Sequence, residues 1–378
     1  MTAESPFFAR NFAPFRADHV GSLLRPSALK ASRVLRSCGE MNAEELRQAE
    51  DLAIESAVRK QASLGLQGIT DGEFRRAYWH FDFLGELDGV ELADSSTGIQ
   101  FHGGTSRRKI LSATGKVGYK PHSHVEHFQF LRNRVKNFAG AVAKVSIPSP
   151  SVLHYRSGRK HVSESVYPDM TEYFHDVGQA FREAVNAFAA AGCEYLQLDE
   201  PNFAFLCDPE QREMLRDRGD DPDRLPGVYA DLINAAIADR PSRMRVTMHL
   251  CRGNFRSMWI AQGGYEPVAD VLFNQIDVNG YFMEWDSDRA GGFEPLRLVP
   301  KGKVVTLGIL TTKIGDLEPK DFLKRRLDEA SKFLPLDQLC LGPQCGFAST
   351  EEGNTLTEEE QWAKLARVVE TARDVWGD

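Results

Sequence analysis

The sequence of 378 residues contains few cysteines and no long apolar segment. No run approaches the roughly eighteen apolar residues of a transmembrane helix, and the N-terminal MTAESPFFARNF lacks the basic and apolar regions of a signal peptide. We therefore expect a cytoplasmic protein. In that reducing compartment, cysteines without the spacing of a disulfide framework are free thiols or metal ligands. This applies to all six: Cys38, Cys193, Cys207, Cys251, Cys340 and Cys345.

The sequence also lacks the features that bind nucleic acids or nucleotides. The net charge is −8 and no long Lys/Arg run is present, whereas a nucleic-acid surface needs a basic stripe. The segment ATGKVG has neither the spacing nor the terminal Ser/Thr of a phosphate loop, and no strand-linked Gly-x-Gly-x-x-Gly occurs. We expect small-molecule substrates and no nucleic-acid or membrane partner, and the sequence leaves a homo-oligomer open.

Short apolar runs that alternate with longer amphipathic ones predict a parallel sheet with crossover helices. Helical periodicity follows Met41 and precedes Gly192, and it also extends up to Asp239, Leu334 and Trp376. The order predicts an α/β fold, a single (β/α)8 TIM barrel over residues 1–378. Eight strands are expected, at 18–22, 66–73, 141–150, 195–200, 245–251, 275–284, 303–310 and 338–346.

The regular pattern breaks between about Arg75 and Gly140. This stretch is rich in aromatic residues, histidine and glycine, and it shows no clean helix. We predict a long insertion after the second strand, over residues 75–140, with its own hairpin and lying over the barrel mouth.

Polar side chains stand at the ends of several predicted strands, where (β/α)8 barrels place catalytic residues. His249 and Cys251 end the fifth strand and point the same way, because strand side chains alternate between faces. With Glu284 after the sixth strand and Cys345 after the eighth, they form a donor set suited to tetrahedral Zn²⁺. The alternative interpretation is a core histidine, buried thiols and a solvated loop acid.

A second polar group comes from three other strand ends. Glu73 and Asp199 suit a general acid and base, the ligands of a hard metal ion, or a seat for a substrate cation. Their alternatives are a loop salt bridge and a helix N-cap. Gly21 and Ser22 offer backbone N–H groups and a hydroxyl for a carboxylate. Paired acids and N–H donors together describe a pocket for an α-amino acid.

Six motifs follow one another along nearly the whole chain: HVGSLLRP, ITDGEF, LQLDEP, MHLC, YFMEWDSDRAG and GPQCGF. In this order they resemble the catalytic, C-terminal barrel of cobalamin-independent methionine synthase. The resemblance implies a zinc-dependent methyltransferase that moves a methyl group from a 5-methyltetrahydrofolate-like donor to the thiol of homocysteine, giving methionine. The chain is similar to the short relatives that consist of the core barrel without the family's additional N-terminal domain.

The resemblance also implies roles for individual residues. The family's zinc ligands correspond to His249, Cys251, Glu284 and Cys345. The family's homocysteine contacts correspond to Val20, Gly21 and Ser22 for the carboxylate, and to Glu73 and Asp199 for the amine. Zn²⁺ favours the ionised form of a substrate thiol, and the thiolate is the nucleophile. Asp199 then contributes to catalysis by holding the substrate in position.

Two family positions differ in this sequence. The family has a proton-donating histidine after the seventh strand, where TLGILTTKIG places Lys313 or a threonine, so Lys313 is the candidate for that catalytic step. The family's tryptophan that stacks on the pterin has no counterpart in SIPSPSVLHY. The donor is therefore open, and a methyl-corrinoid is one alternative. Another is zinc-dependent alkyl transfer to a different thiol, as in epoxide:coenzyme M transferases, although coenzyme M has no ammonium for Glu73 and Asp199.

Two groups of residues in the predicted insertion have both a functional and a structural interpretation. Five basic residues bind the glutamate tail of a folate or form a solvated face: Arg107, Arg108, Lys109, Lys116 and Lys120. Four aromatic residues stack on the donor or form the insertion's own small core: Tyr78, Trp79, Phe81 and Phe83.

Overall fold

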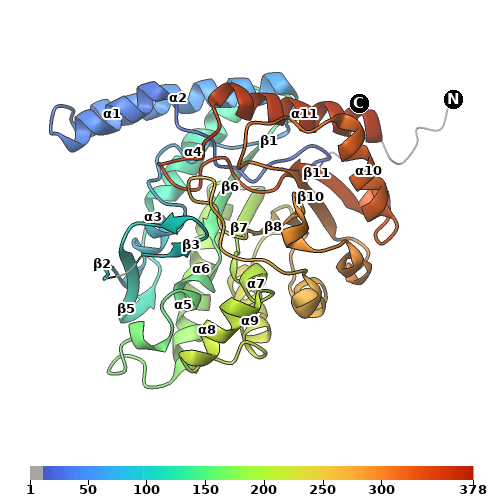
Figure 1. Cartoon of the computed structure of the whole chain (residues 1–378). Helices are drawn as coiled ribbons and strands as arrows, with labels where there is room; N and C mark the ends of the chain where they lie inside the picture. Colours follow the sequence, from blue (N-terminus) through green and yellow to red (C-terminus); the bar gives the residue numbers. More distant parts are fainter. Residues whose placement is uncertain (1–11, 97, 378) are drawn as a thin grey trace.

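Seven parallel strands form one curled sheet at the centre of the molecule (Figure 1). The computed structural model describes residues 12–96 and 98–377, and the strand order there is β1-β6-β7-β8-β9-β10-β11, consistent with a TIM-like barrel. Apart from the first residues of β6 and β8, every residue of these strands is buried, as expected when helices cover a parallel sheet. The strands are β1 Gly68–Ile69, β6 Val142–Pro148, β7 Tyr195–Asp199, β8 Arg245–Leu250, β9 Gly280–Glu284, β10 Val304–Leu310 and β11 Leu339–Pro343.

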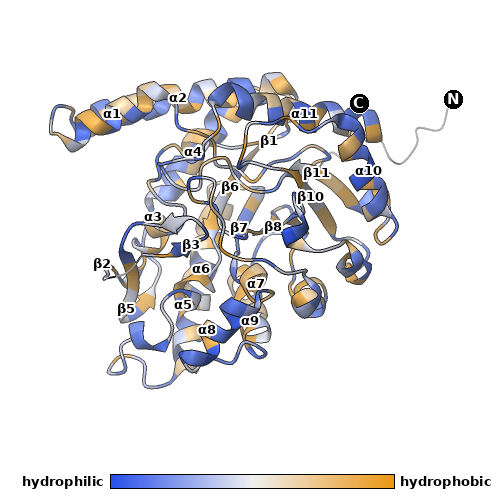
Figure 2. Cartoon of the chain, in the orientation of Figure 1, coloured by the Kyte–Doolittle hydropathy of each residue, from blue (hydrophilic) through white to orange (hydrophobic). Residues whose placement is uncertain are grey.

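Helices lie along the outside of the sheet, and local signals explain where they begin and end. α2 begins with a capping box in which Asn42 and Glu45 exchange hydrogen bonds, and it ends at Gly65, whose φ is 93°. α11 begins with the same device, formed by Thr357 and Glu360. Figure 2 shows the alternation of hydrophilic and hydrophobic residues along both helices. The helices are α1 Ser27–Ser37, α2 Ala43–Leu64, α3 Phe81–Leu84, α4 Ser123–Val135, α5 Val152–Tyr155, α6 Met170–Ala190, α7 Asn202–Phe205, α8 Pro209–Asp217, α9 Leu225–Ile237, α10 Lys320–Ser331 and α11 Glu358–Trp376.

Seven of the predicted strands are present, but the first is not a strand of the sheet. The segment 18–22 pairs with β11 only at its start, where Asp18 N donates to Leu341 O at 3.1 Å. Farther along, Leu23 N donates to Gly72 O at 3.0 Å, just beyond β1. The segment therefore lies between β11 and β1 without a regular ladder to either. The prediction of eight strands is corrected to seven.

Side chains take the place of the missing ladder. Thr70 Oγ1 donates to the carbonyl of Gly21 at 2.7 Å. Ser146 Oγ and Gln197 Nε2 donate to the carbonyl of Val20 at 3.2 and 2.9 Å. Buried backbone groups must be paired, and polar side chains of β6 and β7 meet that need here. An apolar pattern in the sequence cannot distinguish such a segment from a strand.

Asp18 anchors this segment inside the curled sheet. Its carboxylate accepts hydrogen bonds from the hydroxyl of Tyr195 at 2.7 Å and from the backbone N–H of Phe15 at 3.1 Å. It also accepts from the N–H of His19 at 2.8 Å and lies 3.3 Å from Lys144 Nζ. The side chains of Asp18 and Lys144 are both fully buried. Such a pair is strongly destabilising when one partner is removed, because the other charge is left buried and uncompensated.

Residues 70–122, between β1 and α4, contain two small antiparallel sheets, drawn in cyan tones in Figure 1. The expectation of no helix before Gly140 is wrong, because α4 buries Phe128, Leu131 and Val135 at three- and four-residue spacing. The histidines and arginines of α4 obscure that spacing in the sequence. That residues 75–140 form one insertion over the barrel mouth stays a prediction. The strands are β2 Asp88–Asp94, β3 Gln100–Phe101, β4 Gly104–Thr105 and β5 Lys109–Gly118.

Within residues 12–96 and 98–377, no helix combines the length and the hydropathy needed to cross a bilayer. The N-terminal residues used for the prediction of cytoplasmic location lie almost wholly outside the described part of the chain.

Replacing Asp18 tests whether its ion pair anchors the segment. We expect Asp18→Asn to lower the free energy of unfolding in urea by about 3–5 kcal/mol, because Lys144 stays buried without its counter-charge. The control is Asp94→Asn, which removes the exposed partner of Lys109 and should change the free energy by less than about 0.5 kcal/mol. Equal effects of the two substitutions would contradict the anchoring role.

Candidate active site

Four metal-ligand side chains meet at the carboxyl ends of the strands. His249 lies near the end of β8 and Cys251 just beyond it, Glu284 ends β9, and Cys345 follows β11. Their ligand atoms all lie within 4.8 Å of one another, and the two Sγ atoms are 3.4 Å apart. Cys251 is half-buried and the other three are buried. We call these four residues the rim cluster; they are the four that the sequence predicts as zinc ligands.

The donor set and its surroundings fit a divalent metal ion. His249 Nδ1 lies 3.3 Å from Asp199 Oδ1, which leaves Nε2 as the free nitrogen. That nitrogen is buried and has no hydrogen-bond partner among the described residues. An imidazole with one nitrogen on a carboxylate and the other unengaged is the usual state of a metal-ligating histidine. Two thiols, an imidazole and a carboxylate match the ligands that Zn²⁺ takes in proteins.

The carboxylate of Glu284 is held from two sides. Its Oε1 accepts a hydrogen bond from the backbone N–H of Arg252 at 2.8 Å, and its Oε2 accepts one from Gln344 Nε2 at 3.3 Å. Arg289 Nη2 lies 3.6 Å from the same Oε2. These contacts fix the orientation of a buried acid and compensate part of its charge.

Without a metal ion, the residues of the rim cluster shift one another's pKa values in opposite directions. Burial would raise the pKa of the Cys345 thiol, but a hydrogen bond from Cys251 and the charge of His249 lower it to about 6. Burial would lower the pKa of His249, but the charge of Cys345 and the bond to Asp199 raise it to about 10. The hydrogen bond to Cys345, together with burial, holds the pKa of Cys251 well above its usual range. Of the two cysteines in the rim cluster, Cys345 therefore ionises first and is mostly thiolate at neutral pH.

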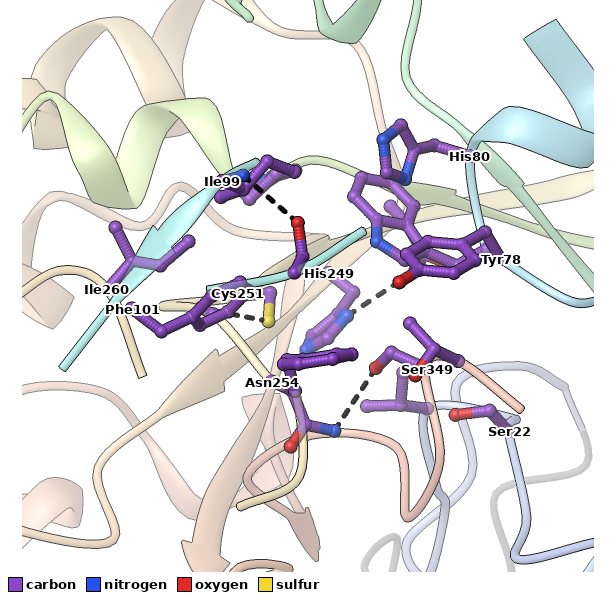
Figure 3. Close-up of a pocket in the computed structure, with 18 of the residues that line it drawn as sticks. Ser22, Tyr78, His80, Ile99, Phe101, His249, Cys251, Asn254, Ile260 and Ser349 are labelled. Carbon is purple, nitrogen blue, oxygen red and sulfur yellow. Dashed lines mark hydrogen bonds and ion pairs between the residues drawn. The ribbon is translucent and has the colours of Figure 1, made fainter. Parts of the chain in front are cut away.

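A cavity opens beside His249 and Cys251 (Figure 3). Of the residues predicted to bind an amino acid, four line this cavity and one does not. Gly21 is not among the lining residues, and its φ of 139° is a conformation that glycine adopts most readily. The four that do are Val20, Ser22, Glu73 and Asp199.

Glu73 is held in a strained backbone conformation at this cavity. Its φ of 59° lies in the left-handed region, which residues with a Cβ rarely adopt and which clusters at functional sites. The carboxylate is buried 3.6 Å from Arg76 Nη1, and its Oε2 has no hydrogen-bond partner among the described residues. Burial raises the pKa of Glu73 to about 7, with Arg76 opposing and Asp199 adding to the rise. A cationic group between Glu73 and Asp199 would satisfy both acids.

Gly346 lets the N-terminal segment approach the turn that carries Cys345. A Cβ at Gly346 would lie only 1.9 Å from Ser22 Oγ, so a larger residue would displace Ser22. Phe347 N also donates to Ser22 O at 2.9 Å. The two segments therefore define one wall of the cavity together.

Lys313 lies near the rim cluster, but its ammonium contacts the loop that follows β8. Its Nζ donates to Gly253 O at 3.0 Å and to Met258 O at 3.4 Å, and it lies 3.5 Å from Asn254 Oδ1. Lys313 is buried and is not among the residues that line the cavity. The observed contacts stabilise this loop, and a part in proton transfer stays a prediction.

Six polar residues of the cavity were not predicted from the sequence: His80, Ser106, Arg156, Asn254, Ser349 and Thr350. Asn254 Nδ2 donates to Gly346 O at 2.7 Å and to Ser349 Oγ at 3.1 Å, so it joins two loops. The segment RGNF directly follows the His-x-Cys pair, and that position was a usable signal for Asn254. No local pattern marks His80 or Arg156, because only the fold brings them to the cavity.

The aromatic residues near the start of the predicted insertion divide between the two interpretations. Tyr78 and Trp79 line this cavity and Phe81 lines a second one, described below, whereas Phe83 is buried in the hydrophobic core. The neighbouring basic residues mostly form ion pairs, as a solvated face would. These pairs are Arg107 with Glu351, Lys109 with Asp94, Lys116 with Glu172 and Lys120 with Asp88.

A second cavity of about 280 Å³ adjoins the first. The two share four lining residues, which form the boundary between them: His80, Ile99, Arg156 and Ile260. Both ring nitrogens of His80 are buried without a hydrogen-bond partner among the described residues, and so is Nε of Arg156. Burial lowers the pKa of Arg156 to about 10, so it remains a cation, 5.2 Å above the ring of Phe205. A half-buried cation at this boundary is suited to an anionic or hydrogen-bond-accepting ligand group.

Three known proteins resemble the chain over nearly its whole length. The uncharacterised protein YxjH of Bacillus subtilis is 49% identical over 365 residues, which cover 96% of this chain and 95% of YxjH. A methionine synthase of Saccharolobus solfataricus is 23% identical and covers 94% of this chain and 93% of its own length. A solved Listeria monocytogenes structure, described as a candidate vitamin-B12-independent methionine synthase, is 40% identical with a TM-score of 0.78 and covers 97% and 99%.

The family model of the cobalamin-independent synthase catalytic domain matches residues 15–374, a range that includes the whole rim cluster and the cavity beside it. The chain therefore belongs to the family of the cobalamin-independent synthase catalytic domain.

Proposed function

We propose that this protein is a zinc-dependent S-methyltransferase that moves a methyl group from a 5-methyltetrahydrofolate-like donor to the thiol of homocysteine, giving methionine. One observation carries the proposal. The rim cluster gathers within 4.8 Å beside a cavity that also contains Glu73 and Asp199, so a metal-ligand set and an ammonium-binding pair share one pocket. Membership of the cobalamin-independent synthase family supports the same chemistry.

The four residues of the rim cluster would hold the zinc ion. When bound, Zn²⁺ lowers the pKa of a substrate thiol and so supplies the nucleophilic thiolate. Asp199 orients the imidazole of His249 through Nδ1, which sets the nitrogen that faces the metal. Arg252 and Gln344 hold the carboxylate of Glu284 in the same way.

The amino-acid part of homocysteine would bind on the other side of the cavity. Glu73 and Asp199 would pair with its ammonium, and the backbone of Val20, Gly21 and Ser22 would bind its carboxylate. Support comes from Oε2 of Glu73, which accepts no hydrogen bond from the described residues, and from the raised pKa of Glu73, since a bound cation would relieve both.

The transfer forms a bond between the substrate sulfur and the methyl carbon while the bond from that carbon to the donor nitrogen breaks. The nitrogen keeps the electron pair and takes up a proton, and the thiol proton has already left. The protein's contribution is to align sulfur, carbon and nitrogen in a cavity from which water is excluded. Lys313, which holds the loop after β8, remains the predicted proton donor.

The donor would occupy the second cavity, with its methyl group directed through the boundary toward Cys251. Arg156, at that boundary, would donate to the carbonyl oxygen of the pterin ring, because the carboxylates of a folate lie at the opposite end of the molecule from its methyl group. Phe81, which lines the second cavity, would supply an aromatic surface in place of the family's tryptophan, and Trp79 would extend that surface into the first cavity.

Two alternatives keep the zinc and the thiol but change one partner. A sulfonate thiol such as coenzyme M would suit Arg156, but it would bring no ammonium group to the acids Glu73 and Asp199. A methyl-corrinoid is larger than a cavity of about 280 Å³ and would have to approach from outside. The geometry therefore favours homocysteine and a smaller donor.

We also propose that residues 16–23 take the eighth strand position of a (β/α)8 barrel and that residues 70–122 are an insertion at its mouth. Support comes from the bonds of this segment to β11 and to Gly72, and from Tyr78 and Trp79 in the cavity lining. Cytoplasmic location and a homo-oligomeric state stay predictions.

The zinc assignment is tested by removing one thiolate. We expect Cys251→Ser to lose about one equivalent of bound zinc per chain relative to the wild type, because Zn²⁺ binds thiolate far better than a hydroxyl. Zinc is measured by elemental analysis after dialysis, and circular dichroism checks the fold. The control Cys38→Ser, at an exposed cysteine, should keep its zinc. If Cys251→Ser retains full zinc, the ligand assignment is wrong.

The ammonium site is tested with Glu73→Gln and with 4-mercaptobutyrate, a homocysteine analogue that lacks the amine. We expect Glu73→Gln to raise the KM for homocysteine about 30-fold or more, and to change that for the analogue little. Only the ionised carboxylate binds the ammonium, and the pKa of Glu73 is about 7. The wild-type KM for homocysteine should therefore rise as pH falls below about 7, and this rise should be weaker in the variant. Equal losses for both thiols would remove the ammonium role.

The donor site is tested by steady-state kinetics of Arg156→Leu with 5-methyltetrahydrofolate. We expect its KM for the donor to rise about 10-fold or more, since the donor loses a charge-assisted hydrogen bond from Arg156. The KM for homocysteine should stay unchanged. Arg156→Lys, which keeps the charge, should recover part of the loss. A rise in the KM for homocysteine alone would instead assign Arg156 to the amino-acid carboxylate.

A further inference from the structure

We propose that Glu86, His122 and His124 form a second divalent-metal site, separate from the rim cluster. Glu86 follows α3, His122 is the N-cap residue of α4, and His124 lies in the first turn of α4. Their ligand atoms lie within 4.8 Å of one another, and none of the three lines the cavity at the rim. The inference goes beyond the proposed methyl transfer and does not depend on it.

The distances suit three ligands around one ion. His122 Nδ1 lies 3.1 Å from His124 Nδ1 and 3.3 Å from Glu86 Oε2. A metal ion bound at about 2.0–2.1 Å by nitrogen and oxygen separates neighbouring ligand atoms by about 3 Å. Imidazole with carboxylate suits zinc and the neighbouring divalent transition metals, and three protein ligands leave a position for water.

The atoms around the ligands orient them as in known metal sites. The Nε2 nitrogen of His122 lies 2.9 Å from Phe83 O and donates to it, so Nδ1 carries the free lone pair. The carboxylate of Glu86 accepts hydrogen bonds from Ser123 N at 2.9 Å and Ser123 Oγ at 2.6 Å. Both ligands are thus fixed before a metal arrives.

Without a metal, His122 Nδ1 pairs with His124 Nδ1 at 3.1 Å when His124 carries its proton there, and Nε2 of His124 is left buried without a hydrogen-bond partner among the described residues. With its proton on Nε2, His122 brings the lone pair of Nδ1 to 3.3 Å from the carboxylate of Glu86, and two acceptors repel each other unless a cation joins them. The backbone N–H of His124, at 3.3 Å from the same Nδ1, is a long contact that a metal would replace.

The site would connect the end of α3 to the start of α4. Phe83 of α3 stacks on His122, with ring centroids 4.4 Å apart, and packs on Phe181 of α6. α3 directly follows Tyr78, Trp79 and His80, which line the candidate active site. A metal here would therefore hold the segment that carries these three side chains, and the partly exposed Glu86 gives the ion a route in.

Cobalt titration of the full-length apoprotein separates the two sites. Co²⁺ bound by thiolate absorbs through sulfur-to-metal charge transfer, whereas Co²⁺ bound by imidazole and carboxylate lacks this band. We expect the wild type to bind two ions per chain by elemental analysis, with the charge-transfer band complete after one. Glu86→Gln and His124→Phe should each bind one ion and keep the full band. His127→Gln, which changes the next histidine of α4, should still bind two.

The proposal is overturned if the wild type binds a single ion that gives the charge-transfer band. It is also overturned if Glu86→Gln and His124→Phe both retain a second ion, which would then be bound at the surface. Glu86→Gln alters a partly exposed side chain by one atom, so it decides the outcome if His124→Phe fails to fold. Cys251→Ser should lose the charge-transfer band and keep one ion. If the wild type binds cobalt but shows no charge-transfer band, the result counts against the rim cluster and not against this site.

Discussion

The buried ion pair between Asp18 and Lys144 is the interaction on which the geometry of the candidate active site depends. It holds an extended segment between β11 and β1, although side chains rather than a strand ladder pair much of that segment's backbone. With the segment in place, Ser22 packs against Gly346, and the turn that carries Cys345 is fixed beside β8 and β9. The ion pair therefore influences the candidate active site by fixing the backbone of this segment, and not by placing a charge in the cavity.

Burial then gives the side chains at the rim their chemistry. The parallel strands end on one side of the curled sheet, so acids, thiols and an imidazole from distant parts of the sequence share a small volume of low dielectric. Such groups are stable only with a cation beside them. A metal ion would compensate the rim cluster, and a substrate ammonium would compensate Glu73 and Asp199. The proposed metal and the proposed amino acid therefore meet the same need for positive charge beside buried acids and thiols.

Features that follow from residue order could be predicted from the sequence, and those that follow from packing could not. His249 and Cys251 were found because strand alternation places them on one face, and Glu284 and Cys345 because parallel strands end together. The loss of the first strand was not foreseen, since Thr70 and its partners replace a ladder by contacts that no local pattern records. Arg156 was missed because its place at the cavity boundary depends on the whole fold.

X-ray absorption at the zinc edge, on full-length protein loaded with one zinc ion per chain, tests the central claim most directly. We predict two sulfur neighbours together with nitrogen and oxygen ligands, as the rim cluster provides, and a changed zinc environment after homocysteine is added. A zinc environment without sulfur, or a spectrum that homocysteine leaves unchanged, would contradict a zinc-dependent transfer to the homocysteine thiol.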